Sequence, residues 1–256
     1  MTSKSKMDGF FGFMANAAAL CITQPIDTIK TRFQVRPDST VSEVARGIYA
    51  NHGARGFYAG LTPNLATYPI FWAAFFGSNQ VMKDVTVSEN RHVDKFCKYY
   101  TSGMIGSAIA NPLFVLKIRS QNTCAPIREV VRQVEQTGYR TYYRGLGATY
   151  INNLKLGIQF PLYDLFKDRT QSVALSSFGA KTVSSAVLYP FELIRTQQRG
   201  ATTDLTIRQT AANIYQHSGI RGFYRGLVLY NLVTTPNFVI MMLGMEFMRS
   251  QFGKRS

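Results

Sequence analysis

Catalytic and metal-binding patterns are scarce in this chain of 256 residues. Its three histidines and three cysteines are scattered, no CxxC pair occurs, and the odd number of cysteines argues against a disulfide framework. No arrangement of Ser, His and Asp suited to nucleophilic catalysis emerges either. We therefore expect that the protein is not an enzyme, has no catalytic residues, holds no metal and uses no cofactor.

Charge is also scarce, and the surplus has one sign. Charged residues make up 17% of the chain, yet Lys and Arg exceed Asp and Glu so far that the formal net charge is +15. A nucleic-acid-binding protein would be soluble and would cluster its basic residues in stripes. Here the basic residues fall mostly between apolar segments, which is typical of a membrane protein with basic loops. We expect no nucleic-acid partner.

Long apolar runs are missing as well. No stretch of about 18 uninterrupted apolar residues occurs, and the mean hydropathy is −0.06. Hydropathy alone would therefore assign a soluble protein. A helix that lines a water-filled cavity, however, needs an apolar face only toward lipid, and its inner face can carry polar residues. Membrane helices of this kind remain compatible with the composition.

What the sequence does have is an internal repeat that occurs three times. A proline-centred motif with following charged residues begins at Pro25, Pro112 and Pro190. An aromatic–glycine element follows each motif and ends at Gly60, Gly145 and Gly226. Two markers that recur three times in one order indicate a single domain built of three repeats, at about 7–88, 91–170 and 172–253.

Six apolar stretches frame these markers. They cover approximately residues 9–24, 61–82, 95–111, 147–166, 173–189 and 227–248. We expect all six to be helices, with an amphipathic segment in each polar connection. Small residues in the odd-numbered stretches permit close helix packing in a bilayer, although a soluble helical core would use them too. The sequence therefore predicts an all-α membrane protein.

The motif Pro-x-Asp-x-x-Lys-x-Arg that starts at Pro25, with its two relatives and the three aromatic–glycine elements, strongly resembles the mitochondrial carrier family. The resemblance covers about residues 8–250. It implies six transmembrane helices in a pseudo-threefold barrel, short amphipathic helices on the matrix side, and a multi-pass protein of the mitochondrial inner membrane. It also implies metabolite transport by alternating access, by a monomer, with the motif prolines kinking the odd helices.

The resemblance also implies a gate on the matrix side. By the family pattern Asp27 pairs with Lys117, and Glu192 pairs with Lys30. An acid at position 114 should pair with Arg195, but residue 114 is Phe, so we expect two ion pairs instead of three. The family's brace positions below these pairs hold Gln34, Gln121 and, in the third repeat, Arg199.

A second gate is expected at the cytoplasmic ends of the even helices. Its residues are Gln80, Lys83, Asp164, Lys167, Glu246 and Arg249. Since Gln80 is an amide where the pattern has an acid, this gate also lacks one ionic link. Fewer links on both sides should lower the barrier between the two states.

Cardiolipin is the lipid that the resemblance implies as a partner. Its expected ligands lie in the aromatic–glycine elements, at Gly60, Arg144, Gly145, Arg225 and Gly226. A helix start attracts phosphate, and the net positive charge suits contact with anionic lipid. Interfacial anchoring by the aromatic residues is the alternative interpretation.

Substrate residues are expected near the middle of the cavity. By their positions in the repeats they are Asn16, Thr67, Tyr68, Asn152, Asn153, Lys155, Lys181 and Thr234. Two of them are lysines, and no acid lies within the helices between the gates, which indicates an anionic substrate. Together with amides and aromatic rings this favours exchange of a nucleotide or another phosphorylated anion. Snorkelling of Lys155 to the interface would explain that lysine differently.

Two other functions remain open at this point. Tyr58-Ala-Gly60 and Gln159-Phe-Pro-Leu-Tyr163 look like the S-adenosylmethionine carriers of the same family, although a cationic sulfonium would want a nearby acid. The missing gate acids are also compatible with a carrier-fold adaptor that no longer transports. Uptake into liposomes separates transport from the adaptor role.

Overall fold

A computed structural model of the chain describes residues 20–36, 39–85, 88–201, 203 and 205–252. Within these ranges the chain forms helices and connecting loops, and it contains no strand. The expected all-α architecture is confirmed for this part. Asn16 and the first part of the first expected helix lie outside the described residues.

The longer helices correspond to the six predicted stretches. In chain order they are residues 20–35, α3 (Leu61–Val81), α4 (Arg91–Thr123), α6 (Leu146–Asn152) with α7 (Leu154–Thr170), α8 (Val173–Gly200) and α10 (Leu227–Phe252). The helices α4 and α8 are longer than expected, because they continue through Pro112 and Pro190 and include the charged motifs. A proline inside a helix removes one backbone hydrogen bond, so these positions are where a bend is expected. None of the described helices combines the length and the hydropathy required to cross a membrane.

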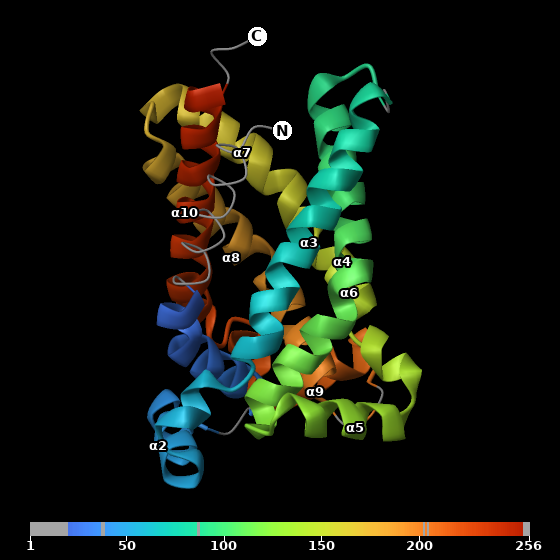
Figure 1. The fold of residues 1–256 in the computed structure, drawn as a ribbon, viewed down its shortest axis with the longest axis vertical. Helices are drawn as coiled ribbons and strands as arrows, with labels where there is room; N and C mark the ends of the chain where they lie inside the picture. The colour runs from blue at the N-terminus through green and yellow to red at the C-terminus, as the bar shows by residue number, and fades with distance from the viewer. Residues whose placement is uncertain (1–19, 37–38, 86–87, 202, 204, 253–256) are drawn as a thin grey trace.

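One shorter helix follows the first long helix of each repeat, that is, residues 20–35, α4 and α8. These shorter helices are α2 (Val41–His52), α5 (Ile127–Thr137) and α9 (Ile207–Gly222), and they lie at the same end of the molecule (Figure 1). Their ends are encoded locally: Thr40 and Thr206 each form a capping box at the start of a helix. Each predicted polar connection therefore contains a helix, and the three helices lie at one end of the bundle.

The aromatic–glycine elements have the same backbone form in all three repeats. Gly60, Gly145 and Gly226 have φ angles of +75°, +72° and +82°. Each lies directly before the second long helix of its repeat, which starts with α3, α6 or α10. The 3-10 helices η1 (Ala54–Tyr58) and η3 (Tyr139–Tyr143) lead into the first two of these turns. Left-handed backbone favours glycine, so the recurrence of glycine in the sequence reflects a recurring turn.

Each of these glycines also packs against a neighbouring repeat. A Cβ at Gly60 would lie 3.0 Å from the Lys117 carbonyl oxygen, and one at Gly145 would lie 3.1 Å from that of Arg195. A Cβ at Gly226 would lie 3.4 Å from the side chains of Gln34 and Phe33 in the first repeat. Because glycine has no side chain, the second long helix of each repeat can start close to the charged motif of a neighbouring repeat.

Polar residues make up much of the described interior. Aromatic and aliphatic side chains cluster where α3, α7, α8 and α10 meet, around Phe75, Phe160 and Phe238. Beyond that cluster, buried Ser, Thr, Asn, Gln and Lys side chains line the contacts between helices. A short 3-10 helix, η2 (Met82–Asp84), follows α3. This polar interior is where the candidate site lies.

Candidate functional site

The Asp27 carboxylate joins the first helix to α4. Its Oδ2 lies 2.9 Å from Lys117 Nζ and accepts a 2.8 Å hydrogen bond from Gln121 Nε2. Its Oδ1 accepts from Lys30 Nζ, one turn away in the same helix, at 2.6 Å. The predicted contact of Asp27 with Lys117 is therefore present, and Gln121 lies beside it. All four side chains are buried, so loss of one partner would strand a charge away from water at a cost of about 3–5 kcal/mol.

Glu192 joins α8 to the helices of the second repeat. Its Oε2 accepts hydrogen bonds from Lys155 Nζ at 2.9 Å and from Asn152 Nδ2 at 3.0 Å, and its Oε1 contacts Arg195 in the same helix. The predicted ion pair between Glu192 and Lys30 is wrong. Lys30 binds the carboxylate three residues before it, which helix geometry always keeps within reach, and Lys155 approaches Glu192 from α7 instead.

Phe114 stands at the acid position that the second repeat lacks. Arg195, the expected partner of such an acid, contacts the carboxylate of its own helix. The guanidinium of Arg199 lies 4.7 Å from the centre of the Phe114 ring, and it donates to Asn111 Oδ1 at 2.7 Å and Thr149 Oγ1 at 3.0 Å. A cation is attracted to the face of an aromatic ring. A cation–π contact therefore occupies the place of the missing ion pair.

In the described residues, hydrogen bonds and a cation–π contact of Arg225 with the Phe33 ring, at 4.1 Å, join the third repeat to the first. Gln34 Nε2 donates to the Tyr189 hydroxyl at 2.8 Å, and Gln197 Nε2 donates to the Gln34 carbonyl oxygen at 3.0 Å. The Tyr189 hydroxyl in turn donates to the Arg225 carbonyl oxygen at 2.6 Å. Gln34 was expected to brace an ion pair, and it binds a tyrosine instead. The three junctions between repeats thus differ in chemistry, although the backbone repeats.

Asp27, Glu192 and the basic side chains that contact them form what we call the charged layer. Two lysines extend from the region of this layer toward the aromatic cluster. Lys155 Nζ donates to the Tyr230 hydroxyl at 2.8 Å, and it lies 5.3 Å from the centre of that ring. Lys181 Nζ lies 3.4 Å from Gln159 Oε1 and 5.5 Å from the centre of the Phe238 ring. In the part of the chain that the structure describes, Lys181 forms no ion pair with a carboxylate.

Tyr230 escaped the sequence prediction. It lies four residues after Gly226, one turn before the positions counted as substrate contacts, and packing explains an aromatic residue there equally well. In the structure its ring lies close to both Lys30 and Lys155, at 5.4 Å and 5.3 Å. The position of Tyr230 between the two lysines becomes visible only in the structure, where the first helix, α7 and α10 come together.

The other predicted substrate residues separate into two groups. Tyr68 faces the charged layer, with its ring centre 5.2 Å from Lys117 Nζ. Thr67 and Thr234 bond to carbonyl groups one turn earlier in their own helices. Asn153 donates to Gly103 O and to Ser107 Oγ on α4, at 2.9 Å and 2.8 Å, so it fixes the helix contact where α6 and α7 meet. Of the predicted set, Tyr68, Asn152 and Lys155 therefore reach the charged layer.

The predicted cytoplasmic gate residues lie at the opposite end from α2, α5 and α9. Asp164 contacts Lys95 of the same repeat at 3.2 Å, and Lys167 Nζ lies 5.9 Å from the centre of the Tyr163 ring. Gln80 and Lys83 are exposed. The side chains of Glu246 and Arg249 lie outside the described residues. The ion pair of Asp164 is thus within one repeat and partly open to solvent.

The arginines of the aromatic–glycine elements are engaged with backbone carbonyls. Arg144 Nη1 donates to Ala201 O at 3.0 Å, and Arg225 donates to Phe33 O at 3.1 Å and Arg36 O at 2.9 Å. Both arginines therefore connect repeats. Lipid binding by these two arginines stays a prediction, whereas their contacts between repeats are present in the structure.

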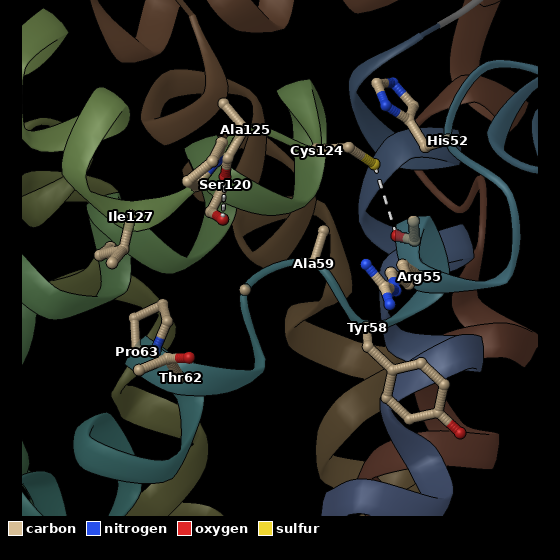
Figure 2. Close-up of a pocket in the computed structure, with 13 residues that line it drawn as sticks. His52, Arg55, Tyr58, Ala59, Thr62, Pro63, Ser120, Cys124, Ala125 and Ile127 are labelled. Atoms are coloured by element: carbon tan, nitrogen blue, oxygen red, sulfur yellow. Dashed lines mark hydrogen bonds between the residues drawn. The ribbon is translucent and has the colours of Figure 1, made fainter.

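A cavity of about 320 Å³ lies beside the first of these elements (Figure 2). Its lining includes His52, Arg55, Tyr58, Gly60, Thr62 and Cys124. Figure 2 shows the Cys124 thiol directed toward the η1 segment, where it donates to Gly56 O at 3.4 Å. Burial raises the pKa of the Cys124 thiol, so the protonated form is the one that makes this bond. The cavity therefore has a basic side chain, Arg55, beside the amino end of α3.

Comparison with known proteins agrees with the repeat. A model of the mitochondrial carrier protein family matches residues 4–90, 91–174 and 169–256. The chain is 29% identical to "Nicotinamide adenine dinucleotide transporter 2, mitochondrial" from Arabidopsis thaliana, over 93% of this chain and 77% of the relative. It is 27% identical to "Mitochondrial substrate carrier family protein W" from Dictyostelium discoideum, over 93% and 83%.

A yeast relative extends this picture. The "Mitochondrial nicotinamide adenine dinucleotide transporter 1" of Saccharomyces cerevisiae is 26% identical over 98% of this chain and 77% of the relative. These three relatives are named as transporters or carriers, which agrees at the family level with the expectation of a protein that is not an enzyme. The three family matches, which together span residues 4–256, show that the chain belongs to the mitochondrial carrier protein family.

Proposed function

We propose that the protein exchanges a nucleotide or another phosphorylated anion across the mitochondrial inner membrane. One observation carries the choice of an anion: buried positive charge exceeds buried negative charge around the candidate site. The buried lysines are Lys30, Lys117, Lys155 and Lys181. Among the described residues the buried carboxylates are Asp27 and Glu192. Charges removed from water require compensation, and an anionic ligand between these lysines would supply it.

The surroundings of the lysines suit a nucleotide. Asn152 offers an amide, and the rings of Tyr68, Tyr230 and Phe238 lie within 5.5 Å of a lysine Nζ. Amides can recognise the edge of a base, and aromatic rings can stack on it. The names of the two nicotinamide adenine dinucleotide transporters among the relatives support the same class of ligand.

The transport mechanism follows from the two ends of the molecule. The charged layer joins the repeats next to α2, α5 and α9, which we assign to the matrix side (Figure 1). At the other end Gln80 and Lys83 are exposed, and Asp164 pairs with Lys95 of its own repeat. We therefore assign the structure to a state closed toward the matrix, of a monomer with six membrane-spanning helices in a pseudo-threefold barrel. Kinks at Pro25, Pro112 and Pro190 would bring the helix ends together.

Cardiolipin belongs to this proposal as a bound lipid. The cavity beside Gly60 has a basic side chain and the amino end of α3 within reach of a phosphate. Melting curves with cardiolipin and with a zwitterionic lipid of equal chain length test the assignment. A larger rise with cardiolipin supports it.

The test of the main proposal is exchange in liposomes. Purified protein is reconstituted with cardiolipin, loaded with unlabelled ATP and supplied with labelled ATP, nicotinamide adenine dinucleotide or S-adenosylmethionine. We expect uptake of a nucleotide that depends on nucleotide inside, and loss of uptake in Lys155→Ala and Lys181→Ala. Uptake of S-adenosylmethionine alone would replace the nucleotide proposal with the sulfonium carrier. A folded protein that exchanges none of them would favour the adaptor role.

A further inference from the structure

Lys155 is the basic group that holds Glu192 to the second repeat. Its Nζ lies 2.9 Å from Glu192 Oε2, and both side chains are buried. Arg195 also contacts this carboxylate, but from the same helix, so its contact does not bind one repeat to another. Lys30 and Lys117, the other lysines of the layer, are both within ion-pair distance of Asp27. The charge-bearing link between α7 and α8 in this layer is therefore the Lys155 ammonium.

The same ammonium faces the place where an anion is proposed to bind. It donates to the Tyr230 hydroxyl at 2.8 Å on one side. Lys181, which lies closer to the aromatic cluster, contacts Gln159 Oε1 at 3.4 Å and the face of the Phe238 ring at 5.5 Å, and within the described residues it pairs with no carboxylate. A phosphate placed between Lys155 and Lys181 would relieve the charge of both. It would then compete with Glu192 for Lys155.

We propose that Lys155 is shared between the substrate and the matrix gate, so that an anion binding to it detaches the second repeat from Glu192. The proposal rests on the proposed anion transport. When the anion takes Lys155, Glu192 keeps Arg195 and Asn152, and it loses its charged partner on α7. The link broken in this way is the Glu192 link, while the Asp27–Lys117 pair is untouched. A neutral or cationic ligand would not break it, because neither would attract the ammonium.

Competition between the anion and Glu192 for Lys155 can be measured as a change in the Kd for the anion. If an anion must displace Glu192 from Lys155, removal of the Glu192 charge makes binding tighter. We expect Glu192→Gln to lower the Kd for ATP about tenfold, within the range typical of coupled binding. Asp27→Asn is the matched control, because it removes an equally buried charge from the neighbouring ion pair without touching Lys155. We expect a much smaller change in that variant.

The experiment measures the Kd for ATP by titration calorimetry and the melting temperature without ligand, on the full chain in detergent with cardiolipin. A double variant that swaps the two charges of the ion pair provides a second test if a single variant folds poorly. Lys155→Glu with Glu192→Lys restores the ion pair but presents an acid to the cavity. We expect the double variant to melt above both single exchanges and to bind no ATP.

The outcomes separate the two proposals. Equal tightening in Glu192→Gln and Asp27→Asn would mean a general effect of charge, and it would overturn the sharing of Lys155 while anion transport stands. So would a double exchange that melts no higher than its single parents. If the wild-type protein binds neither ATP nor another phosphorylated anion, the proposed function fails, and the inference about Lys155 falls with it.

Discussion

The cation–π contact between Arg199 and Phe114 gives a quantitative prediction. Arg199 is 1% exposed, and its guanidinium lies 4.7 Å from the ring centre. A desolvated contact of this kind contributes about 2 kcal/mol. Because a domain of this size shifts its melting temperature by about 2–4 °C per kcal/mol, the contact corresponds to about 4–8 °C.

A double-mutant cycle isolates that contribution. Phe114→Leu keeps an apolar side chain but also removes ring contacts with Tyr68 and Phe71. Arg199→Gln also removes hydrogen bonds to Asn111 and Thr149. These other losses occur in the double variant as well, so they cancel in the coupling energy. The assay is unfolding of the four proteins in detergent at one lipid concentration.

The expected coupling energy is about 2 kcal/mol. Phe114→Tyr serves as the control, because it keeps an aromatic face and should couple to Arg199 nearly as the wild type does. If the two substitutions add within about 0.5 kcal/mol, the ring and the guanidinium do not stabilise each other. The idea that this contact replaces the missing ion pair would then be refuted.

Four further predictions use other parts of the structure. Gly145→Ala should destabilise the protein by about 1–2 kcal/mol, because φ is +72° and the new Cβ would lie 3.1 Å from Arg195 O. Gly147→Ala is the control and should be tolerated, and thermal melting of the two variants tests the difference. Lys181→Met should raise the melting temperature without ligand, because a buried amine without a carboxylate partner is removed, and it should abolish the stabilisation by ATP. Thr40→Ala should cost about 1 kcal/mol by removing the α2 cap. The hydrogen bond from the Thr40 backbone lowers the pKa of Glu43, so the stabilisation by Glu43 should be present near neutral pH and lost as the pH falls through that lowered pKa. Melting of Glu43→Gln and wild type at both ends of this pH range checks the sign.

The sequence was most informative where structure is decided locally. The three glycine turns require positive φ, and the helix caps need a threonine with an acid or amide three residues later. Such demands are visible in a single chain. The recurring glycines located the starts of α3, α6 and α10. The threonine caps of α2 and α9 are equally local signals, but the prediction of these connections did not use them.

Choice of partner was harder to predict. Lys30 has one carboxylate three residues before it and another in a different repeat, and the sequence does not show which one it binds. The reach of Lys155 to Glu192 depends on how α7 packs against α8, and Tyr230 enters the site for the same reason. The absence of an acid at Phe114 was visible, but the use of its ring by Arg199 was not.

The three unlike junctions have a consequence for how the molecule separates. In the described residues one junction contains the Asp27–Lys117 ion pair, and one contains the Lys155–Glu192 ion pair with the Arg199–Phe114 contact. The third contains the Gln34–Tyr189 hydrogen bond with the Arg225–Phe33 contact. Backbone symmetry would let three repeats move apart together, but bonds of different kinds do not yield together. For the matrix gate that we propose, we therefore expect the three repeats to separate one after another rather than together.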